Sequence, residues 1–321
     1  MSGPIFLTGP DRSGTSLLYA LLGTHPNISM VRRSNMFRWF HGRFGDLSIP
    51  ENFERCLQTM LRYERLAPLE PDAERIRREF ARSEPTYGNL FDMIHRHRAE
   101  RVGRPRWGDK SLHTEHHAEA VFEEFPAARM IQVMRDPRDR HASVTRRYTD
   151  VQRNVGPVTG RWLASARALA RNLERYPDRY RLVRYEDLVH SPEAVLREVC
   201  DFIGEPYVEE MLTMQGVPEH QEGNSSFEQF APGTISTKGV GRFATVLARR
   251  DIAFIETAAR NQMGRLGYLP RPEARTSIKA AEIPYLLENL ARMLAWMATH
   301  NERPGKSRGV PAARLSTEGV S

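Results

Sequence analysis

Three short apolar segments stand out in a chain that is otherwise mainly polar and helical in pattern. They are residues 4–9 (PIFLTG), 128–134 (ARMIQVM) and 181–185 (RLVRY). Each is followed by a turn and a helix-like stretch, and the separations are too long for hairpins. Parallel strands joined by crossover helices have this alternation. The pattern therefore predicts an α/β protein, a P-loop-like three-layer fold whose central parallel sheet is flanked by helices.

Helical patterns follow the second apolar segment. They cover residues 139–149, 161–175, 191–204 and 248–268. The third is the clearest, because Ser191 can cap it, Pro192 suits a first turn and Gly204 can end it. We therefore expect helices to separate and cover the predicted strands.

The remaining segments suggest a single domain over residues 1–300. Residues 29–107 form a long, mostly helical insert, which we expect to be a substrate-facing cap because loops at the carboxyl ends of strands build sites. Residues 221–241 are rich in Gly and Ser and are predicted to be a loop. Residues 283–298 carry an apolar helical stripe, interpreted as a packing helix, and residues 301–321 are predicted to be a flexible tail.

Composition narrows the class of protein. Hydrophobic residues make up 40% of the chain and charged residues 27%, which is enough for a packed core. There are 47 basic and 40 acidic residues, a net charge of +7, and this surplus favours an anionic partner. A nucleotide, a phosphate- or sulfate-bearing substrate, a nucleic acid and an anionic membrane surface all meet that description.

Cysteine usage and hydropathy bear on location. Cys56 and Cys200 lie far apart and form neither a disulfide framework nor a metal-ligand set, which is consistent with a reducing cytosol. No secretory signal pattern and no uncharged apolar run long enough to span a membrane is visible. We therefore expect a cytoplasmic protein without a membrane span.

The first apolar segment leads into Gly9-Pro10-Asp11-Arg12-Ser13-Gly14-Thr15-Ser16, which nearly spells the nucleotide-binding motif GxxxxGK[ST]. A strand, a glycine-rich turn and a helix start together form a nest of backbone N–H groups for an anion. Thr15 occupies the position of the motif's lysine, so γ-phosphate transfer would lack its main charge stabiliser. The cation in this loop is instead Arg12. The loop is therefore predicted to bind an anion other than a transferred γ-phosphate.

A second candidate anion site follows the second predicted strand, in RDPRDRHAS. Arg135 stands at the strand end and Ser143 lies eight residues later in the following helix. The forked guanidinium of arginine fits phosphate oxygens, and both residues lie at the same edge of the sheet. Arg135 and Ser143 are therefore predicted to converge on one phosphate.

These motifs resemble those of sulfotransferases that use 3′-phosphoadenosine 5′-phosphosulfate (PAPS), on the branch of the protein-tyrosine and glycan enzymes. The resemblance covers roughly residues 4–270 and includes RYEDLVHSPEAVLREVCDFIGEPY at 184–207. It implies that PAPS is the co-substrate and that three groups of residues bind it. They are Arg12, Ser13, Gly14, Thr15 and Ser16 for the phosphosulfate, Arg135 and Ser143 for the 3′-phosphate, and Ser236, Lys238, Gly239 and Arg242 in a late loop that closes over the nucleotide.

The resemblance also implies a mechanism. Sulfuryl transfer in line requires positioning and charge stabilisation, for which Arg12 and Lys110, the latter within WGDKSLH, are the candidates, and no metal is expected. In protein-tyrosine sulfotransferases, a glutamate soon after the HP of the first helix acts as the catalytic base. The corresponding stretch here, HPNISMVRRSNMFRWF, contains no carboxylate. The remaining candidates for the base are Asp109, His113 and His117. Asp109 can equally form an ion pair with Lys110, and the histidines can be solvent-exposed residues of a helix.

The acceptor and two alternative functions stay open. A hydroxyl or amine of a small molecule, lipid or glycan is expected, with no nucleic acid, and the oligomeric state is undetermined. Aromatic and Met residues of the insert suggest an apolar or aromatic acceptor, although core packing explains them equally well: Met30, Met36, Phe37, Trp39, Phe40 and Phe44. A P-loop kinase would need the missing lysine and Mg²⁺. A non-catalytic module that binds nucleotides or polyanions would bind without turnover.

Overall fold

The fold is built on five parallel strands. The computed structural model describes residues 3–148, 154–217, 233–268, 280–299, 310–311 and 314–315. The strands lie in the order β2-β3-β1-β4-β5. Their bounds are β1 (Ile5–Thr8), β2 (Ile28–Arg32), β3 (Arg106–Lys110), β4 (Arg129–Met134) and β5 (Tyr180–Arg184). The predicted α/β fold with a central parallel sheet is confirmed.

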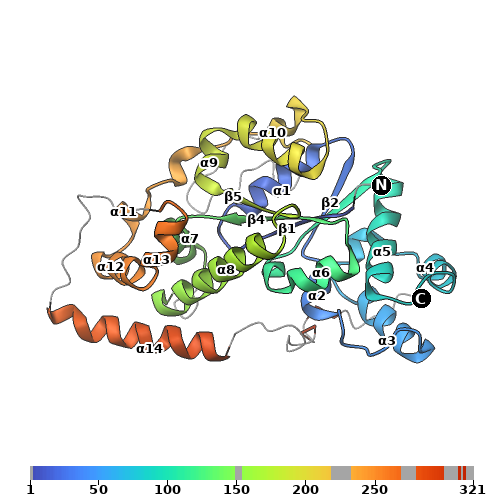
Figure 1. Cartoon of the computed structure of the whole chain (residues 1–321), viewed down its shortest axis with the longest axis horizontal. Coiled ribbons are helices and arrows are strands. Elements are labelled where there is room, and N and C mark those ends of the chain that lie inside the picture. The colour runs from blue at the N-terminus through green and yellow to red at the C-terminus, as the bar shows by residue number, and fades with distance from the viewer. Residues whose placement is uncertain are drawn as a thin grey trace.

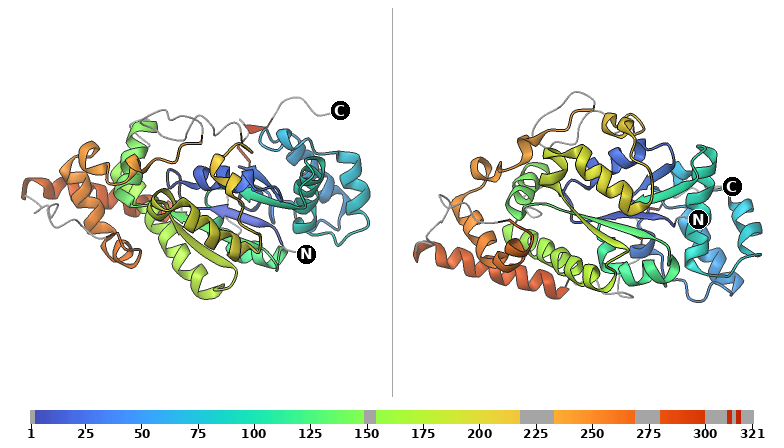
Figure 2. Two further views of the ribbon diagram at one scale, coloured as in Figure 1. Left: turned by 90° about the horizontal axis from the view of Figure 1, so that it is seen from above. Right: turned by 45° about the horizontal axis from the view of Figure 1, so that its top comes forward.

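Helices cover both faces and both ends of this sheet. Those before β4 are α1 (Thr15–Thr24), α2 (Met36–Trp39), α3 (Pro50–Leu61), α4 (Ala73–Phe80), α5 (Tyr87–Arg101) and α6 (Ala118–Glu124), with the short 3₁₀ helices η1 (Ala67–Leu69) and η2 (Thr114–His117). Those after β4 are α7 (Pro137–Arg147), α8 (Val155–Arg175), α9 (Tyr185–His190), α10 (Pro192–Ile203), α11 (Phe243–Val246), α12 (Arg249–Ala258), α13 (Arg260–Arg265) and α14 (Ile283–Thr299), with η3 (Glu209–Thr213), η5 (Thr237–Gly239) and η7 (Ala280–Glu282). In Figure 1, α1, α9 and α10 lie on one face and α6 and α8 on the other. Figure 2 shows α3–α5 and α12–α14 toward opposite ends of the molecule.

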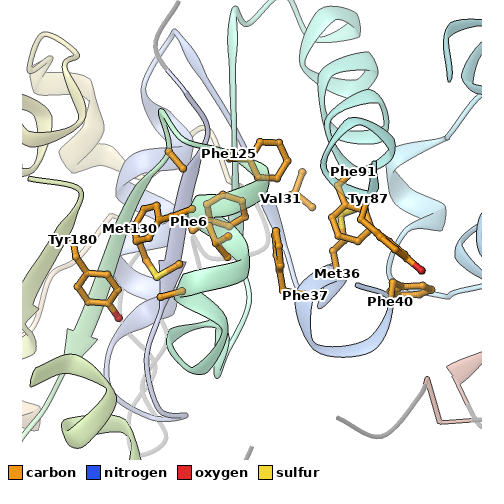
Figure 3. Packing of buried hydrophobic residues seen from close by; sticks show 14 of the residues in the cluster. Phe6, Val31, Met36, Phe37, Phe40, Tyr87, Phe91, Phe125, Met130 and Tyr180 are labelled. Atoms are coloured by element: carbon orange, nitrogen blue, oxygen red, sulfur yellow. The ribbon is translucent and has the colours of Figure 1, made fainter. Parts of the chain in front are cut away.

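Side-chain alternation along β1 divides the core into two layers. Ile5 and Leu7 pack with the leucines of α1, whereas Phe6 packs on the opposite face. Successive side chains of a strand point to opposite faces, so a strand buried on both sides reads as a continuous apolar run. In Figure 3, Phe6 lies beside Phe37 and Phe125, and its ring meets that of Phe37 edge-on at 5.7 Å. The sheet therefore has an apolar core on each face, and with the helices that cover both faces it forms three layers.

The prediction of three strands was incomplete. Two further strands, β2 and β3, lie at the two ends of the predicted 29–107 insert. β3 reads RWGDK, which is polar, yet all five residues are buried. Its Arg106 remains buried because the guanidinium donates to the Gly3 and Ile203 carbonyls at 2.6 and 2.7 Å and lies 3.1 Å from a Glu205 carboxylate oxygen. Polar strands with internal partners have no apolar pattern to detect.

The aromatic and Met residues of the insert serve mainly as core. Met36, Phe37 and Phe40 are buried with Tyr87 and Phe91 of α5, as Figure 3 shows. Trp39 and Phe44 are partly buried against the same cluster. Core packing therefore accounts for these side chains, and they are not evidence of an apolar acceptor.

Two predicted helices begin earlier than expected, and one is divided. α7 begins at Pro137 because the Asp136 side chain accepts the Arg138 N–H at 2.8 Å, and α8 begins at Val155. The stretch 248–268 contains two helices, with a break at Ala259.

α10 matches its predicted signals in part. Gly204 ends the helix in the left-handed conformation at φ 74°, as expected. Ser191 stands at the N-cap, but its side chain accepts no hydrogen bond from the helix there, contrary to the predicted cap.

α14 packs lengthwise on α8. Asn289 and Met293 are buried in this contact, and the Arg161 guanidinium lies 5.5 Å from the ring of Trp296. Part of the predicted packing stripe faces outward instead: Ile283, Leu287, Leu290 and Leu294 are exposed. No helix in the described part of the chain is long and apolar enough to cross a membrane.

Two predicted irregular segments are described only in part. Of the predicted loop 221–241, residues 233–241 are described and contain η5, and the rest lies outside the described residues. Of the predicted tail 301–321, Leu315 pairs with Tyr63 in an antiparallel bridge, so this part of the tail is docked.

Candidate functional site

The connection from β1 to α1 has the backbone geometry of an anion nest. Three of its residues have positive φ: Gly9 (138°), Arg12 (65°) and Gly14 (94°). A Cβ on Gly14 would lie 2.4 Å from the Tyr185 ring, so only glycine fits there. The loop leads directly into the first turn of α1, where Thr15 and Ser16 begin the helix, and the combination of such a loop with a helix start favours anion binding.

A lysine reaches this loop from a neighbouring strand. Lys110 ends β3, beside β1 in the sheet, and its Nζ donates to Ser16 Oγ at 3.2 Å. Burial, with Arg33 and Arg32 nearby, lowers the Lys110 pKa to about 7. The cation that the motif lacks at Thr15 is thus supplied by a residue 94 positions away from Ser16.

The second predicted anion site lies against the first. Arg12 Nε donates to Ser143 Oγ at 3.0 Å, although the residues are 131 positions apart. Arg135 Nη1 donates to the Arg12 carbonyl at 3.3 Å, and its guanidinium lies 4.3 Å from the Tyr185 ring centre. The structure therefore brings Arg12, Arg135 and Ser143 together.

The late loop reaches this cluster through Gly239. Arg135 Nη2 donates to the Gly239 carbonyl at 2.6 Å, and a Cβ on Gly239 would lie 2.9 Å from both Arg135 Nη2 and the Tyr185 hydroxyl. Asp139 of α7 holds the loop by accepting the Gly241 and Phe243 N–H groups at 2.7 and 2.8 Å. The other predicted loop residues are Ser236, which accepts the Lys238 N–H at 3.2 Å, and Arg242, which donates to the Lys238 carbonyl at 2.9 Å.

Two buried polar atoms of the cluster lack a partner. Ser13 Oγ and Arg135 Nε have no hydrogen bond to any of the residues that the structure describes. A buried polar group left in this way costs about 1–3 kcal/mol, which a ligand with several anionic oxygens would recover. The donor set therefore fits a phosphate- or sulfate-bearing ligand.

Arg140 supports the loop from beneath, a role that the sequence pattern did not reveal. It is fully buried, and it donates to the Asp11 carbonyl at 2.8 Å, to the Val158 carbonyl at 3.0 Å and to the Asp11 carboxylate. Burial raises the Asp11 pKa, but Arg140 and Arg161 outweigh this effect and lower the value to about 2. Arg140 is the last residue of the motif RDPRDR, in which Arg135 was the arginine assigned a role from the sequence.

Of the predicted bases, Asp109 is separated from the loop by the sheet. It pairs with Phe6 in the register, whereas Lys110 pairs with Leu7, so the two side chains point to opposite faces. Burial raises the Asp109 pKa, and the neighbours that oppose this effect are His95, Ser111 and Ser34. The site therefore does not bring Asp109 to Lys110 Nζ.

His113 interacts electrostatically with Asp11 of the loop, and each influences the pKa of the other. Burial lowers the His113 pKa to about 3, although the charge of Glu115 acts in the opposite direction. Burial also lowers the His117 pKa to about 4. Glu115 accepts hydrogen bonds from Thr8 Oγ1 at 2.5 Å and Ser165 Oγ at 2.7 Å. His113, Glu115 and His116 place potential metal ligands within 4.8 Å of one another, a carboxylate combination that the sequence analysis did not foresee.

Comparison with known proteins identifies the family. The model of the sulfotransferase family matches residues 4–210, which contain the loop, Lys110, Arg135 and Ser143. The fold is similar to the sulfotransferase domain from the curacin biosynthetic pathway, with TM-score 0.55, 18% identity and coverage of 84% of this chain and 99% of that one. Other matches are the sulfotransferase domain of the Synechococcus PCC 7002 olefin synthase (TM-score 0.47, 22% identity, 91% and 96% covered) and mouse SULT7A1 complexed with PAP (0.48, 13%, 89% and 88%). This chain belongs to the sulfotransferase family and is a sulfuryl-transferring enzyme.

Proposed function

We propose that the enzyme transfers the sulfuryl group of PAPS to a hydroxyl or amine of an acceptor. The observation that carries this proposal is the convergence of two anion-binding groups on one loop. Lys110 contacts Ser16 of this loop, and Arg135 and Ser143 contact Arg12 of the same loop. A nucleotide with one anionic group at each end matches such a pair of sites.

Each residue then has a role. Arg12, Ser13, Gly14, Thr15 and Ser16 bind the phosphosulfate, with Lys110 beside them, and Arg135, Ser143, Ser236, Lys238, Gly239 and Arg242 bind the 3′-phosphate side. PAPS supplies the activated sulfuryl group. Arg12 and Lys110 hold positive charge where negative charge grows on the departing phosphate, and this charge stabilisation lowers the barrier.

We assign the base to His113 rather than to Asp109. Asp109 faces the far side of the sheet, whereas the pKa of His113 is influenced by Asp11 of the loop. A pKa of about 3 leaves the imidazole neutral but weakly basic, and the negative charge of a bound phosphosulfate would raise this pKa toward the range of an effective base. Transfer that is undiminished in His113→Ala would remove this assignment.

The acceptor belongs to a small molecule, lipid or glycan, reached beneath helices α2–α5. The cytoplasm is the proposed location, because Cys56 and Cys200 are both buried free thiols. A P-loop kinase is disfavoured because Thr15 stands at the position of the motif's lysine. A non-catalytic module, the alternative from the sequence, would bind the nucleotide without turnover, and the match to the sulfotransferase family favours the enzyme.

The test combines calorimetric titration of adenosine 3′,5′-bisphosphate with radiolabelled PAPS incubated with a panel of acceptors. Micromolar or tighter binding together with label transfer supports the enzyme. Binding without transfer to any acceptor favours the binding module, and absence of binding contradicts the nucleotide assignment.

Arg135→Ala is expected to weaken bisphosphate binding by about 10- to 100-fold, because it removes a charged donor to the 3′-phosphate. Ser143→Ala removes a neutral donor and is expected to cost only about three- to tenfold. Calorimetry of both variants measures the difference. Equal affinity of Arg135→Ala and the unaltered protein would refute the assignment of Arg135.

Bisphosphate affinity is expected to fall as pH rises above about 7. Burial and the charges of Arg33, Arg32 and Arg12 lower the Lys110 pKa to about 7 in the free protein, and the charge of Asp109 acts to raise it. A bound phosphate raises this pKa, so binding above pH 7 requires proton uptake and the Kd rises by about tenfold per pH unit. Lys110→Met has no such group, and its weaker binding is expected to lack this slope. A slope that is the same in both proteins would show that another group titrates.

A further inference from the structure

The sheet order separates the nucleotide side of the site from the acceptor side. β1 is central; β4 and β5 lie on one side of it, with Arg135 at the end of β4 and Tyr185 directly after β5. Lys110 and Arg32, at the ends of β3 and β2, lie on the other side. Since transfer is in line, a nucleotide extending toward β4 and β5 leaves the β3–β2 side for the acceptor.

The chain leaving β2 on that side is strained and tightly held. Arg33 and Asn35 have left-handed φ values of 62° and 51°. The Arg33 N–H donates to the Lys110 carbonyl at 2.8 Å, and the Asn35 N–H donates to Ser111 Oγ at 3.0 Å. The Arg33 carbonyl accepts from Asn35 Nδ2 at 2.8 Å and from the Tyr63 hydroxyl at 3.0 Å. Such backbone conformations persist where the surroundings hold them, often at ligand sites.

This backbone presents Arg33 within a group of like charges. Burial lowers the Arg33 pKa, and Arg32, Arg65 and Arg314 lower it further. In the described part of the chain, the Arg33 side chain is surrounded by protein on one side and open to solvent on the other, and it has no ion pair or hydrogen bond of its own. Like charges are therefore gathered here, and no carboxylate among the described residues pairs with Arg33.

One carboxylate serves two of the neighbouring arginines. Glu64 lies 3.1 Å from Arg65 Nε and 3.1 Å from Arg314 Nη1. Of the neighbouring charges, Arg33 lowers the Lys110 pKa most. The positive region therefore extends to Lys110, where the proposed function places sulfuryl transfer. An anionic ligand at Arg33 would relieve the repulsion and bring its own hydroxyl or amine close to Lys110.

We propose that the acceptor carries an anionic group, a carboxylate, phosphate or sulfate, which binds at Arg33 and Arg65 beside Lys110. This inference rests on the proposed function, because it places the acceptor opposite a nucleotide held by Arg12 and Arg135. It narrows the expected acceptor to one that bears both a nucleophile and an anion.

The experiment titrates hydroxyl compounds into protein saturated with adenosine 3′,5′-bisphosphate, so that the nucleotide's cations are already occupied. Glucose, glucuronate and glucose 6-phosphate differ only in a neutral, carboxylate or phosphate group, and tyrosol and 4-hydroxyphenylacetate form a phenolic pair. Calorimetry compares the unaltered protein with Arg33→Gln, Arg65→Gln and Arg33→Lys. Arg175→Gln is the control for net charge, because its side chain is exposed on α8 and pairs with Glu119.

We expect an anionic member of a series to bind about tenfold or more tightly than its neutral counterpart. Arg33→Gln and Arg65→Gln should remove most of this preference, Arg33→Lys should retain part of it, and Arg175→Gln should retain it fully. Preference for neutral compounds, absence of any preference, or a preference unchanged in both glutamine variants would overturn the proposal. Failure of the bisphosphate itself to bind would instead reject the proposed function, and its retained binding shows that each variant is folded.

Discussion

Lys110→Ala is expected to lower kcat by about 10²–10³-fold, roughly 3–4 kcal/mol of transition-state stabilisation. The reason is that Lys110 Nζ lies 3.2 Å from Ser16 Oγ, and the proposed function places the leaving phosphate, which gains charge during transfer, beside these two residues. The loss should appear in kcat more than in the Kd of the bisphosphate, because the charge grows during transfer. Single-turnover assays with radiolabelled PAPS measure it.

The matched control is Lys238→Ala, which removes a lysine from the late loop and not from the transfer point. Its effect should fall on nucleotide affinity, with kcat changed less than in Lys110→Ala. If Lys110→Ala keeps kcat within about threefold of the unaltered enzyme, Lys110 is not the group that stabilises the leaving phosphate.

Arg140→Ala is expected to lower the free energy of unfolding by about 3–5 kcal/mol and to abolish bisphosphate binding. Arg140 is fully buried and bonds to both the carbonyl and the carboxylate of Asp11, so its loss leaves a buried charge without its closest partner. Urea unfolding and calorimetry measure the two effects.

Two further variants separate charge from packing. Asp11→Asn/Arg140→Met removes both charges and should recover part of the lost stability, because much of the cost is the uncompensated carboxylate. Arg161→Ala should cost less, since Arg161 is partly exposed and lies 3.7 Å from Asp11. A stability change below about 1 kcal/mol in Arg140→Ala would contradict the supporting role.

The same pair makes stability depend on acid. The folded pKa of Asp11 is lowered to about 2, from an unfolded value of about 3.9. A lowered carboxylate pKa contributes stability that is present above the unfolded value and is lost as pH falls through the folded value. The contribution of Asp11 is therefore full above about pH 4–5 and disappears toward pH 2, whereas Asp11→Asn/Arg140→Met should lack it.

Sequence motifs that are contiguous were the easiest to interpret. Gly9 to Ser16 combine a strand end, glycine turns and a helix start within eight residues, and the structure has this geometry. β3 was missed because RWGDK shows no apolar pattern, its burial depending on partners elsewhere in the fold. β2, by contrast, reads ISMVR and is apolar, but it follows α1 directly and was included in the predicted helical insert. The candidate base could not be chosen either, because neighbouring positions in a strand point to opposite faces of the sheet.

The sequence by itself determined the α/β class, the anion loop and the Arg135–Ser143 motif, since each depends on hydrogen bonds and residue types within a few positions. Only the tertiary structure decided where the missing cation comes from and what surrounds it. Lys110 meets Ser16 because β3 lies beside β1, and Arg33 stands beside Lys110 because β2 lies beside β3. Strand order is set by packing of the whole chain, which no local pattern contains.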